Sequence, residues 1–139
     1  MTALARERAG SVRAVTRDLR PVAANVKIHK GALIACTAGF YGPAAAGTGK
    51  RIVGRAAQSV DNTGGAAGAL SVDVHFFYER DLFLLVNSGV NAVTAAMRET
   101  VCYAEDDQTV GSLDTGFSVC GIIYDVTTEG VWVEIGQKA

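Results

Sequence analysis

Short stretches of alternating apolar and polar residues, separated at close intervals by glycine-rich turns, constrain the fold of this chain more than any other feature. From Leu70 to Phe76, and again from Val131 to Ile135, every second residue is apolar. A period of two residues is typical of a β-strand with one buried face. Sequences rich in Gly, Asn and Asp, at 61–65 and 87–89, favour turns between such strands. The pattern therefore predicts an all-β fold.

Five further segments have the composition of short strands, and one has the composition of a single helical turn. The strands are expected at residues 32–37, 51–56, 82–86, 101–104 and 119–126. The helical turn is expected at residues 95–98, with Thr94 as its N-cap. Many short strands with almost no helix predict a small antiparallel β-barrel or sandwich, and no strand–helix alternation supports a parallel sheet.

The beginning of the chain differs from the remainder in charge. Residues 1–20 contain five arginines and two acidic residues, a net charge of +3, whereas residues 21–139 contain 8 basic and 12 acidic residues. Large apolar residues are few in the first segment, and Pro21 ends it. We therefore expect an extended basic N-terminal arm at residues 1–25 and a β-barrel domain at residues 26–139; the alternative is a disordered terminus without a role. The arginines expected to bind a partner are Arg6, Arg8, Arg13, Arg17 and Arg20.

The overall composition argues against several classes of protein. Apolar residues make up 49% and charged residues 19% of the 139 residues, a balance that disordered, collagen-like and coiled-coil chains do not have. A net charge of −1 argues against a dedicated nucleic-acid-binding protein, which needs a strongly basic surface. The uncharged segment 31–49 is interrupted by glycines and Pro43, which disfavours a membrane-spanning helix. The first residues lack the apolar core of a secretory signal.

The three cysteines indicate a reducing compartment. Cys36, Cys102 and Cys120 are widely spaced, and no Cys-x-x-Cys motif is present. Since an odd number of dispersed cysteines does not suit a disulfide framework, we expect reduced side chains buried as small apolar groups in a cytosolic product.

No motif for catalysis, a cofactor or a metal ion emerges from the sequence. The segment 47–51 resembles a phosphate-binding loop, but Ala44 stands where its first glycine is needed and Arg51 where its hydroxyl residue is needed. The acidic residues 105–107 suit a hard cation, but a turn whose aspartates accept backbone hydrogen bonds is favoured. His29 and His75 are isolated from other metal ligands, although a Cys–His pair formed in space stays open. We therefore expect no enzyme activity, no cofactor and no metal.

The most apolar part of the chain lies between residues 76 and 86. Strict alternation fails at 76–78 and 82–86, so apolar side chains occupy both faces of the expected hairpin. One face would line the barrel, and the other would need a second molecule or the arm. We therefore expect self-association through this region; the alternative is a hairpin that supplies core from both faces. The residues assigned to self-association are Phe76, Phe77, Tyr78, Phe83 and Leu85.

Several segments together resemble the head decoration, or capsid cement, proteins of tailed bacteriophages. The resemblance covers about residues 26–136, and its most specific part is the string Asp106-Asp107-Gln108-Thr109-Val110 followed by Gly130-Val131-Trp132-Val133. These proteins often have Thr-Arg-Ser before an Ala-Gly pair, where this chain has Gly116-Phe117-Ser118 and Cys120-Gly121. The arm lies outside the resemblance. The segments that carry it are 30–35, 39–43, 53–56, 60–63, 87–89, 93–96, 101–110 and 130–133.

The resemblance implies a β-barrel, jelly-roll-like in form, that acts as a structural protein of the virion. It implies binding to the outer surface of an icosahedral phage head, with the major capsid protein as partner, and a bridging contact between neighbouring capsid subunits. It also implies synthesis in the cytoplasm of a bacterial host. A homo-oligomer is expected, with dimer and trimer both open.

Three other functions remain as alternatives at this point. The chain could be another virion component, such as a head-completion protein, a tail protein or a host-surface binding module. An enzyme would require a pocket of convergent polar groups around a perturbed Cys or His. The basic arm also allows binding to nucleic-acid phosphates, but the acidic remainder of the chain disfavours it, and we expect no specific nucleic acid and no membrane as partner.

Overall fold

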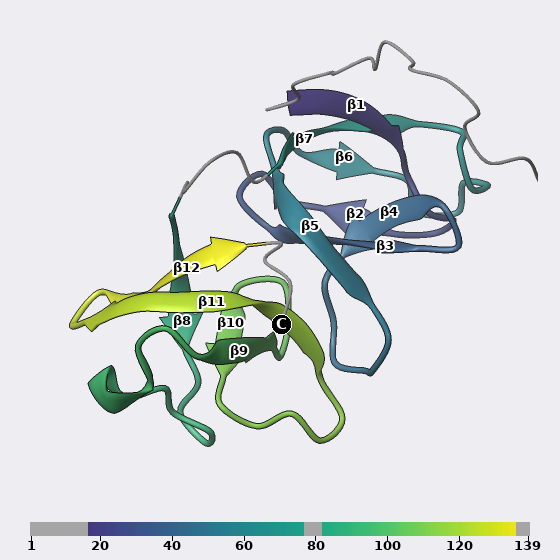
Figure 1. Cartoon of the computed structure of the whole chain (residues 1–139). Helices are drawn as coiled ribbons and strands as arrows, with labels where there is room; N and C mark the ends of the chain where they lie inside the picture. Colours follow the sequence, from purple (N-terminus) through teal and green to yellow (C-terminus); the bar gives the residue numbers. More distant parts are fainter. Residues whose placement is uncertain (1–16, 77–81, 136–139) are drawn as a thin grey trace, which may run out of the picture.

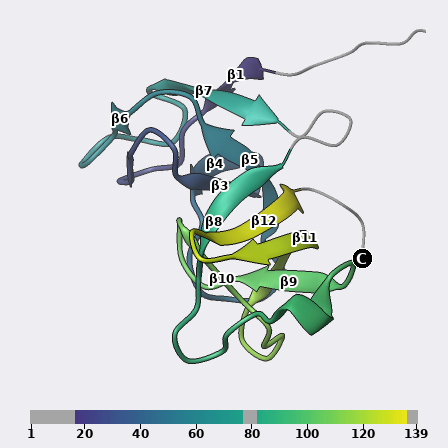
Figure 2. The same ribbon diagram turned by 90° about the vertical axis from the view of Figure 1, so that its left-hand side faces the viewer.

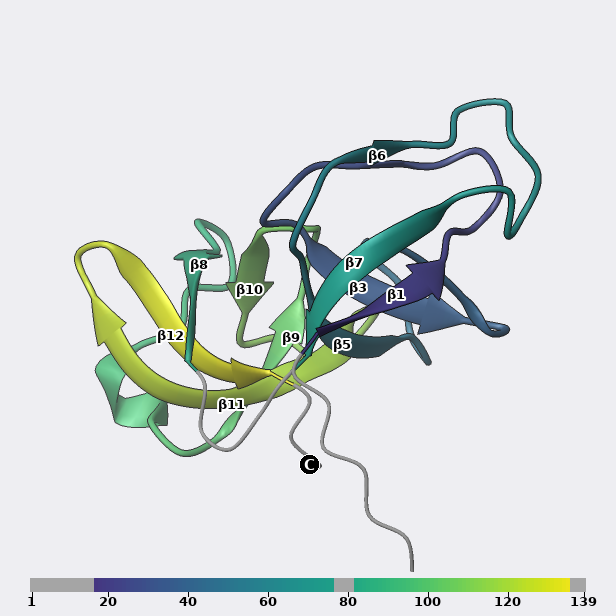
Figure 3. The same ribbon diagram turned by 90° about the horizontal axis from the view of Figure 1, so that it is seen from above.

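The computed structural model of the chain describes residues 17–76 and 82–135, and these form an all-β fold in two lobes (Figure 1). One lobe is a five-stranded sheet with a small two-stranded sheet beside it, and the other is a closed five-stranded barrel. Figure 3 shows the lobes next to each other, with β8 to β12 on one side and β1 to β7 on the other. The predicted all-β fold with a barrel is confirmed.

The barrel is built from the second half of the chain. Its strand order is β10–β8–β12–β11–β9, and Figure 2 shows these strands next to one another. Neighbouring strands are antiparallel except β10 and β8, which run parallel over two residue pairs. The barrel strands are β8 (Phe83–Asn87), β9 (Val101–Ala104), β10 (Thr109–Gly111), β11 (Ser118–Thr127) and β12 (Gly130–Ile135).

The first lobe is a curled sheet. Its strand order is β1–β7–β5–β3–β4, and its two edge strands approach each other where Val22, just after β1, pairs with Tyr41 of β4. The Ala23 N–H donates to the Tyr41 carbonyl at 2.9 Å beside this bridge. The strands are β1 (Arg17–Pro21), β3 (Leu33–Thr37), β4 (Phe40–Pro43), β5 (Arg51–Ala56) and β7 (Ser71–Phe76), with β2 (Lys27–Ile28) and β6 (Val60–Asp61) forming the two-stranded sheet.

Strand β3 joins two apolar cores. Leu33 and Ala35 pack with the barrel interior, whereas Ile34 packs inside the curled sheet. This explains the continuous apolar sequence of β3, since a strand covered on both faces needs no polar side. The Leu33 N–H also donates to the Asp107 carbonyl of the barrel lobe at 2.7 Å. The two lobes therefore share a core and a backbone hydrogen bond.

The predicted elements agree closely with the observed ones. Each strand expected from the sequence is present, with its ends within about one residue of the expected positions. The helical turn is a 3-10 helix over Ala95–Met97, but the Thr94 side chain makes no capping hydrogen bond, so this part of the prediction is wrong. Asp106 Oδ1 accepts the backbone N–H groups of Gln108 and Thr109 at 2.8 and 2.7 Å, which confirms the expected aspartate turn.

The expected arm over residues 1–25 differs from the structure in its last part. Residues 17–21 form β1, which pairs with β7 in an antiparallel register from Arg17–His75 to Pro21–Ser71. Val22 is fully buried inside the curled sheet. The polar composition of β1 hid this, because an edge strand is held by backbone hydrogen bonds and does not need an apolar pattern. The part of the arm at residues 1–16 lies outside the described residues.

Candidate functional site

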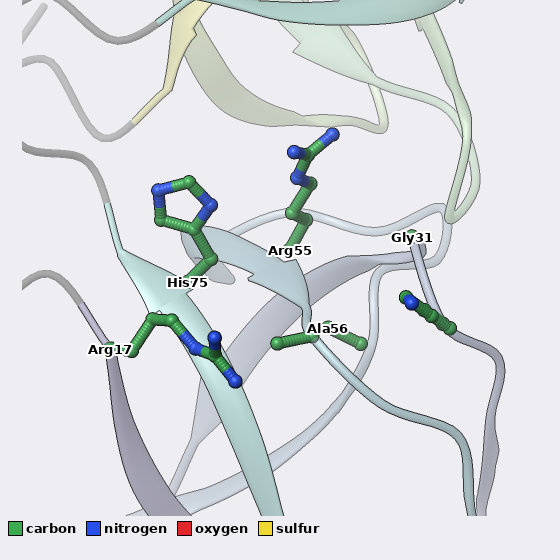
Figure 4. Close-up of a pocket in the computed structure, with 7 residues that line it drawn as sticks. Arg17, Gly31, Arg55, Ala56 and His75 are labelled. Carbon is green, nitrogen blue, oxygen red and sulfur yellow. The ribbon is translucent and has the colours of Figure 1, made fainter.

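A row of basic side chains crosses three strands at the junction of the two lobes. In the sheet register, His75 of β7 lies opposite Arg17 of β1 on one side and opposite Arg55 of β5 on the other. Directly opposed residues of a sheet project from the same face. Figure 4 shows the side chains of Arg17, His75 and Arg55 around a shared space, each coming from a different segment. The fold therefore gathers groups that are far apart in the sequence.

A cavity of about 340 Å³ lies over this row, and a second cavity of about 390 Å³ adjoins it. Lys30 and Gly31 line both cavities, so the two form one groove. The first cavity is lined by Arg17, Lys30, Gly31, Arg55, Ala56, Ala57 and His75. The second is lined by His29, Lys30, Gly31, Ala32, Asp107 and Gln108. We call the pair the cationic groove.

Phe83 of β8 orients two members of the row. The guanidinium carbon of Arg55 lies 4.9 Å from the centre of the Phe83 ring, within the range of a cation–π contact. The His75 ring meets the same ring edge-on, with 5.2 Å between centroids and an interplanar angle of 79°. Since Phe83 is buried in the barrel core, it gives both groups a rigid support.

Arg17 is held at the edge of the groove by an ion pair. Its Nε donates to Asp73 Oδ2 at 3.1 Å, and its Nη2 contacts the same oxygen. This hydrogen bond, with the attraction between the charges, raises the pKa of Arg17 above its ordinary value, so the guanidinium stays charged. Asp73 thus fixes the position of one cation while neutralising part of its charge.

Arg20 does not extend from the fold as the arm hypothesis requires. Its guanidinium carbon lies 5.9 Å from the Tyr41 ring centre and 5.5 Å from that of Phe76. It also contacts Asp18 at 3.7 Å. Arg20 therefore packs across β1, β4 and β7 within the curled sheet, and the assignment of Arg20 to a projecting arm is corrected. Arg6, Arg8 and Arg13 lie outside the described residues.

The described residues among those assigned to self-association are buried or partly buried. Phe83 and Leu85 are 2% and 7% exposed and belong to the barrel core, so their assignment is wrong. Phe76 packs partly buried against the core of the curled sheet, and Phe77 and Tyr78 lie outside the described residues. The side chains that point outward from β8 are Leu84 and Val86, at 37% and 48% exposure. The period of two in a strand predicts that Leu84 and Val86 point away from the face that holds Phe83 and Leu85. Because the run is apolar throughout, the sequence does not show which of the two faces is buried.

The described residues hold no constellation suited to a metal ion. Nowhere in 17–76 and 82–135 do three or more His, Cys, Asp or Glu side chains gather in a group that could hold one. Over the same residues, no helix has the length and apolar character needed to cross a bilayer.

The cysteines are free thiols in different environments. Cys102 and Cys120 are buried, as expected, whereas Cys36 is only half-buried. A hydrogen bond with Cys102, together with burial, raises the pKa of the Cys120 thiol well above its ordinary value. Because the thiolate is the reactive form, neutral pH leaves Cys120 unreactive.

We expect iodoacetamide at pH 7.5 to alkylate Cys36 but not Cys102 or Cys120 in the folded protein. The buried pair lacks both solvent access and, at Cys120, thiolate character. Peptide mass spectrometry after timed labelling measures this, and labelling in denaturant, where all three sites should react, is the control. Labelling of Cys120 as fast as Cys36 would contradict the described packing.

The chain was compared with protein-family models, curated proteins and solved structures. No family model, no curated protein and no solved structure matches the chain.

Proposed function

We propose that this protein is a capsid cement protein that binds the outside of an icosahedral phage head and bridges neighbouring copies of the major capsid protein. The single observation that carries the proposal is the convergence of basic side chains at the junction of the two lobes. Arg17 belongs to the basic segment of residues 1–20 in the sequence, and in the structure it lies in β1 and lines the cationic groove. The resemblance of residues 26–136 to decoration proteins supports the same function.

The proposed action is mechanical. Packaged DNA pushes the shell outward, and capsid subunits tend to separate at their seams. A protein that touches both sides of a seam must lose contact area before the seam opens. A standard interface buries about 800 Å² per partner, and several such contacts act together through effective concentration. Basic groups suit carboxylates on the shell because arginine binds them in a bidentate manner.

Self-association belongs to the same proposal. A dimer would suit a two-fold seam and a trimer a three-fold seam. The outer face of the barrel offers an apolar strip for it, since Leu84 and Val86 of β8 and Tyr124 of β11 are exposed there. Trp132 of β12 pairs with Leu84 in the register and extends the strip. This strip replaces the buried Phe83 and Leu85 as the proposed contact between copies.

The decisive experiment measures binding to purified phage heads that lack this protein. We expect a full-length variant with Arg6, Arg8 and Arg13 all replaced by Gln to bind the heads about tenfold more weakly, since each exposed ion pair contributes up to about 1 kcal/mol. The melting temperature should not change. Co-sedimentation and differential scanning calorimetry give the two readouts.

A matched variant with Lys27, Lys50 and Arg51 replaced by Gln changes the net charge equally on the body of the protein and serves as control. Equal binding by the arm variant and the native protein would remove the arm from the proposal. Gel densitometry against the major capsid protein then distinguishes cement from another virion component. Cement requires many copies on each particle, whereas a head-completion, tail or host-binding protein is present in few.

A further inference from the structure

We propose that the cationic groove is a binding site for an acidic side chain presented by a partner protein, with Arg55 as its bidentate ligand. This inference goes beyond the shell-binding proposal, because it assigns a ligand chemistry to a specific cavity. It also stands without that proposal, since any acidic protein segment would serve.

The charge of the groove is the first support. Arg17, Lys30 and Arg55 line one cavity, and Asp73 is the carboxylate that contacts one of them. Among the described residues, neither Arg55 nor Lys30 forms an ion pair with an acidic side chain. Bringing three like charges together destabilises a fold unless a counter-charge offsets them. An external carboxylate would supply it.

The geometry of Arg55 is the second support. Its guanidinium group lies against the Phe83 ring, and Phe83 is itself fixed in the barrel core. A cation–π contact holds the guanidinium in place, and among the described residues no acidic side chain pairs with it. Because the side chain is already ordered, binding a carboxylate costs less conformational entropy than it would at a mobile arginine. The site is therefore preorganised for a planar oxyanion.

The surroundings favour an acidic protein segment over a nucleic acid. Ala56 and Ala57 give the cavity of about 340 Å³ a partly apolar wall. Asp73 lies beside Arg17, and Asp107 lines the adjoining cavity. These carboxylates would repel a continuous row of phosphates along the groove, whereas a single carboxylate enters between them. A peptide with an isolated acidic residue fits this pattern of charge.

The test is a titration of the full-length protein with a synthetic peptide that carries one glutamate between alanines (the single-glutamate peptide), followed by isothermal calorimetry and by amide chemical shifts. We expect shifts at Gly31, Ala56 and Ala57, which line the cavity. Arg55→Met should weaken binding about tenfold or more, because it removes the charged donor of the proposed hydrogen bonds. Arg51→Met removes an exposed arginine at the other end of β5 and should leave the affinity unchanged.

Lys30→Met provides a second variant in case Arg55→Met lowers stability, and we expect it to weaken binding as well.

Equal weakening by Arg51→Met would overturn the site, because it would reveal general charge attraction. Tighter binding of a single-stranded thymidine oligonucleotide than of the single-glutamate peptide, with the same dependence on Arg55, would replace the acidic partner with a nucleic acid. Inorganic phosphate and sodium chloride are compared, at matched ionic strength, as competitors of the peptide. Displacement of the peptide at a lower concentration of phosphate than of sodium chloride would support a site for an oxyanion. The absence of amide shifts with the single-glutamate peptide would overturn the proposal whatever the outcome with phage heads.

Discussion

Replacing Phe83 with Ala is expected to lower the free energy of unfolding by about 3–5 kcal/mol, the range for loss of a buried aromatic ring. Phe83 is 2% exposed and packs in the barrel core, so its removal leaves a cavity there. The same change removes the support of Arg55 and His75 at the groove. Urea unfolding followed by circular dichroism measures the change in stability.

Leu84→Ala is the matched control for Phe83→Ala. Leu84 is the next residue of β8 and points outward, at 37% exposure, so its truncation should change stability by less than about 1 kcal/mol. Analytical ultracentrifugation of both variants measures their oligomeric state and so distinguishes a residue of the core from a residue of the contact between copies. If Phe83→Ala changed the oligomeric state without lowering stability, the burial of Phe83 described above would be refuted.

Gly54→Ala is expected to lower the free energy of unfolding by about 1–3 kcal/mol or more, because a methyl group has no space at this position. A Cβ atom on Gly54 would lie 2.1 Å from the carbonyl oxygen of His75 and 3.1 Å from the Cα of Phe76. Both are backbone atoms of the paired strand β7, so no side-chain rotation can relieve the contact. The strands β5 and β7 would have to separate, which would also spread the row of Arg17, His75 and Arg55.

Gly89→Ala gives the comparison for a glycine without such a constraint. No atom lies within 4 Å of the position of its Cβ, and we expect a change within about 0.5 kcal/mol. Thermal unfolding of both variants and binding of the single-glutamate peptide by Gly54→Ala measure the two consequences. A Gly54→Ala protein as stable as the native one would show that β5 and β7 do not approach as closely as described.

The strands that the sequence predicts well are those with a strong local pattern. Strands β7 and β12, in which apolar residues alternate with polar ones, lie within one residue of the expected bounds. The strands that no local pattern indicated are short or polar. Strands β2 and β6 have two residues each, β10 has three and β4 has four, too few for a period to appear. Strand β1 owes its place to hydrogen bonds with β7, which no local pattern encodes.

The candidate site could be predicted only in its components. The sequence marks Arg17 as an arm residue and His75 as an isolated histidine, it does not single out Arg55, and nothing in their spacing brings the three together. Arg17 and His75 are 58 positions apart, and Arg55 lies 20 positions before His75. Their proximity follows from the antiparallel register of β1, β7 and β5, a property of the tertiary structure. Phe83 was assigned to a contact surface because an unbroken apolar run does not reveal which alternate residues face inward.

The amino-acid sequence by itself determined that this chain is all-β, where most of its strands begin and end, and that Asp106 closes a turn. These features depend on interactions between residues close in the chain, which local periodicity and turn chemistry encode. Only the tertiary structure decided that β1 belongs to the sheet, that Phe83 and Leu85 face the core, and that three cations share one groove. These features depend on register between distant strands, and a shift of one residue there would reverse every side chain.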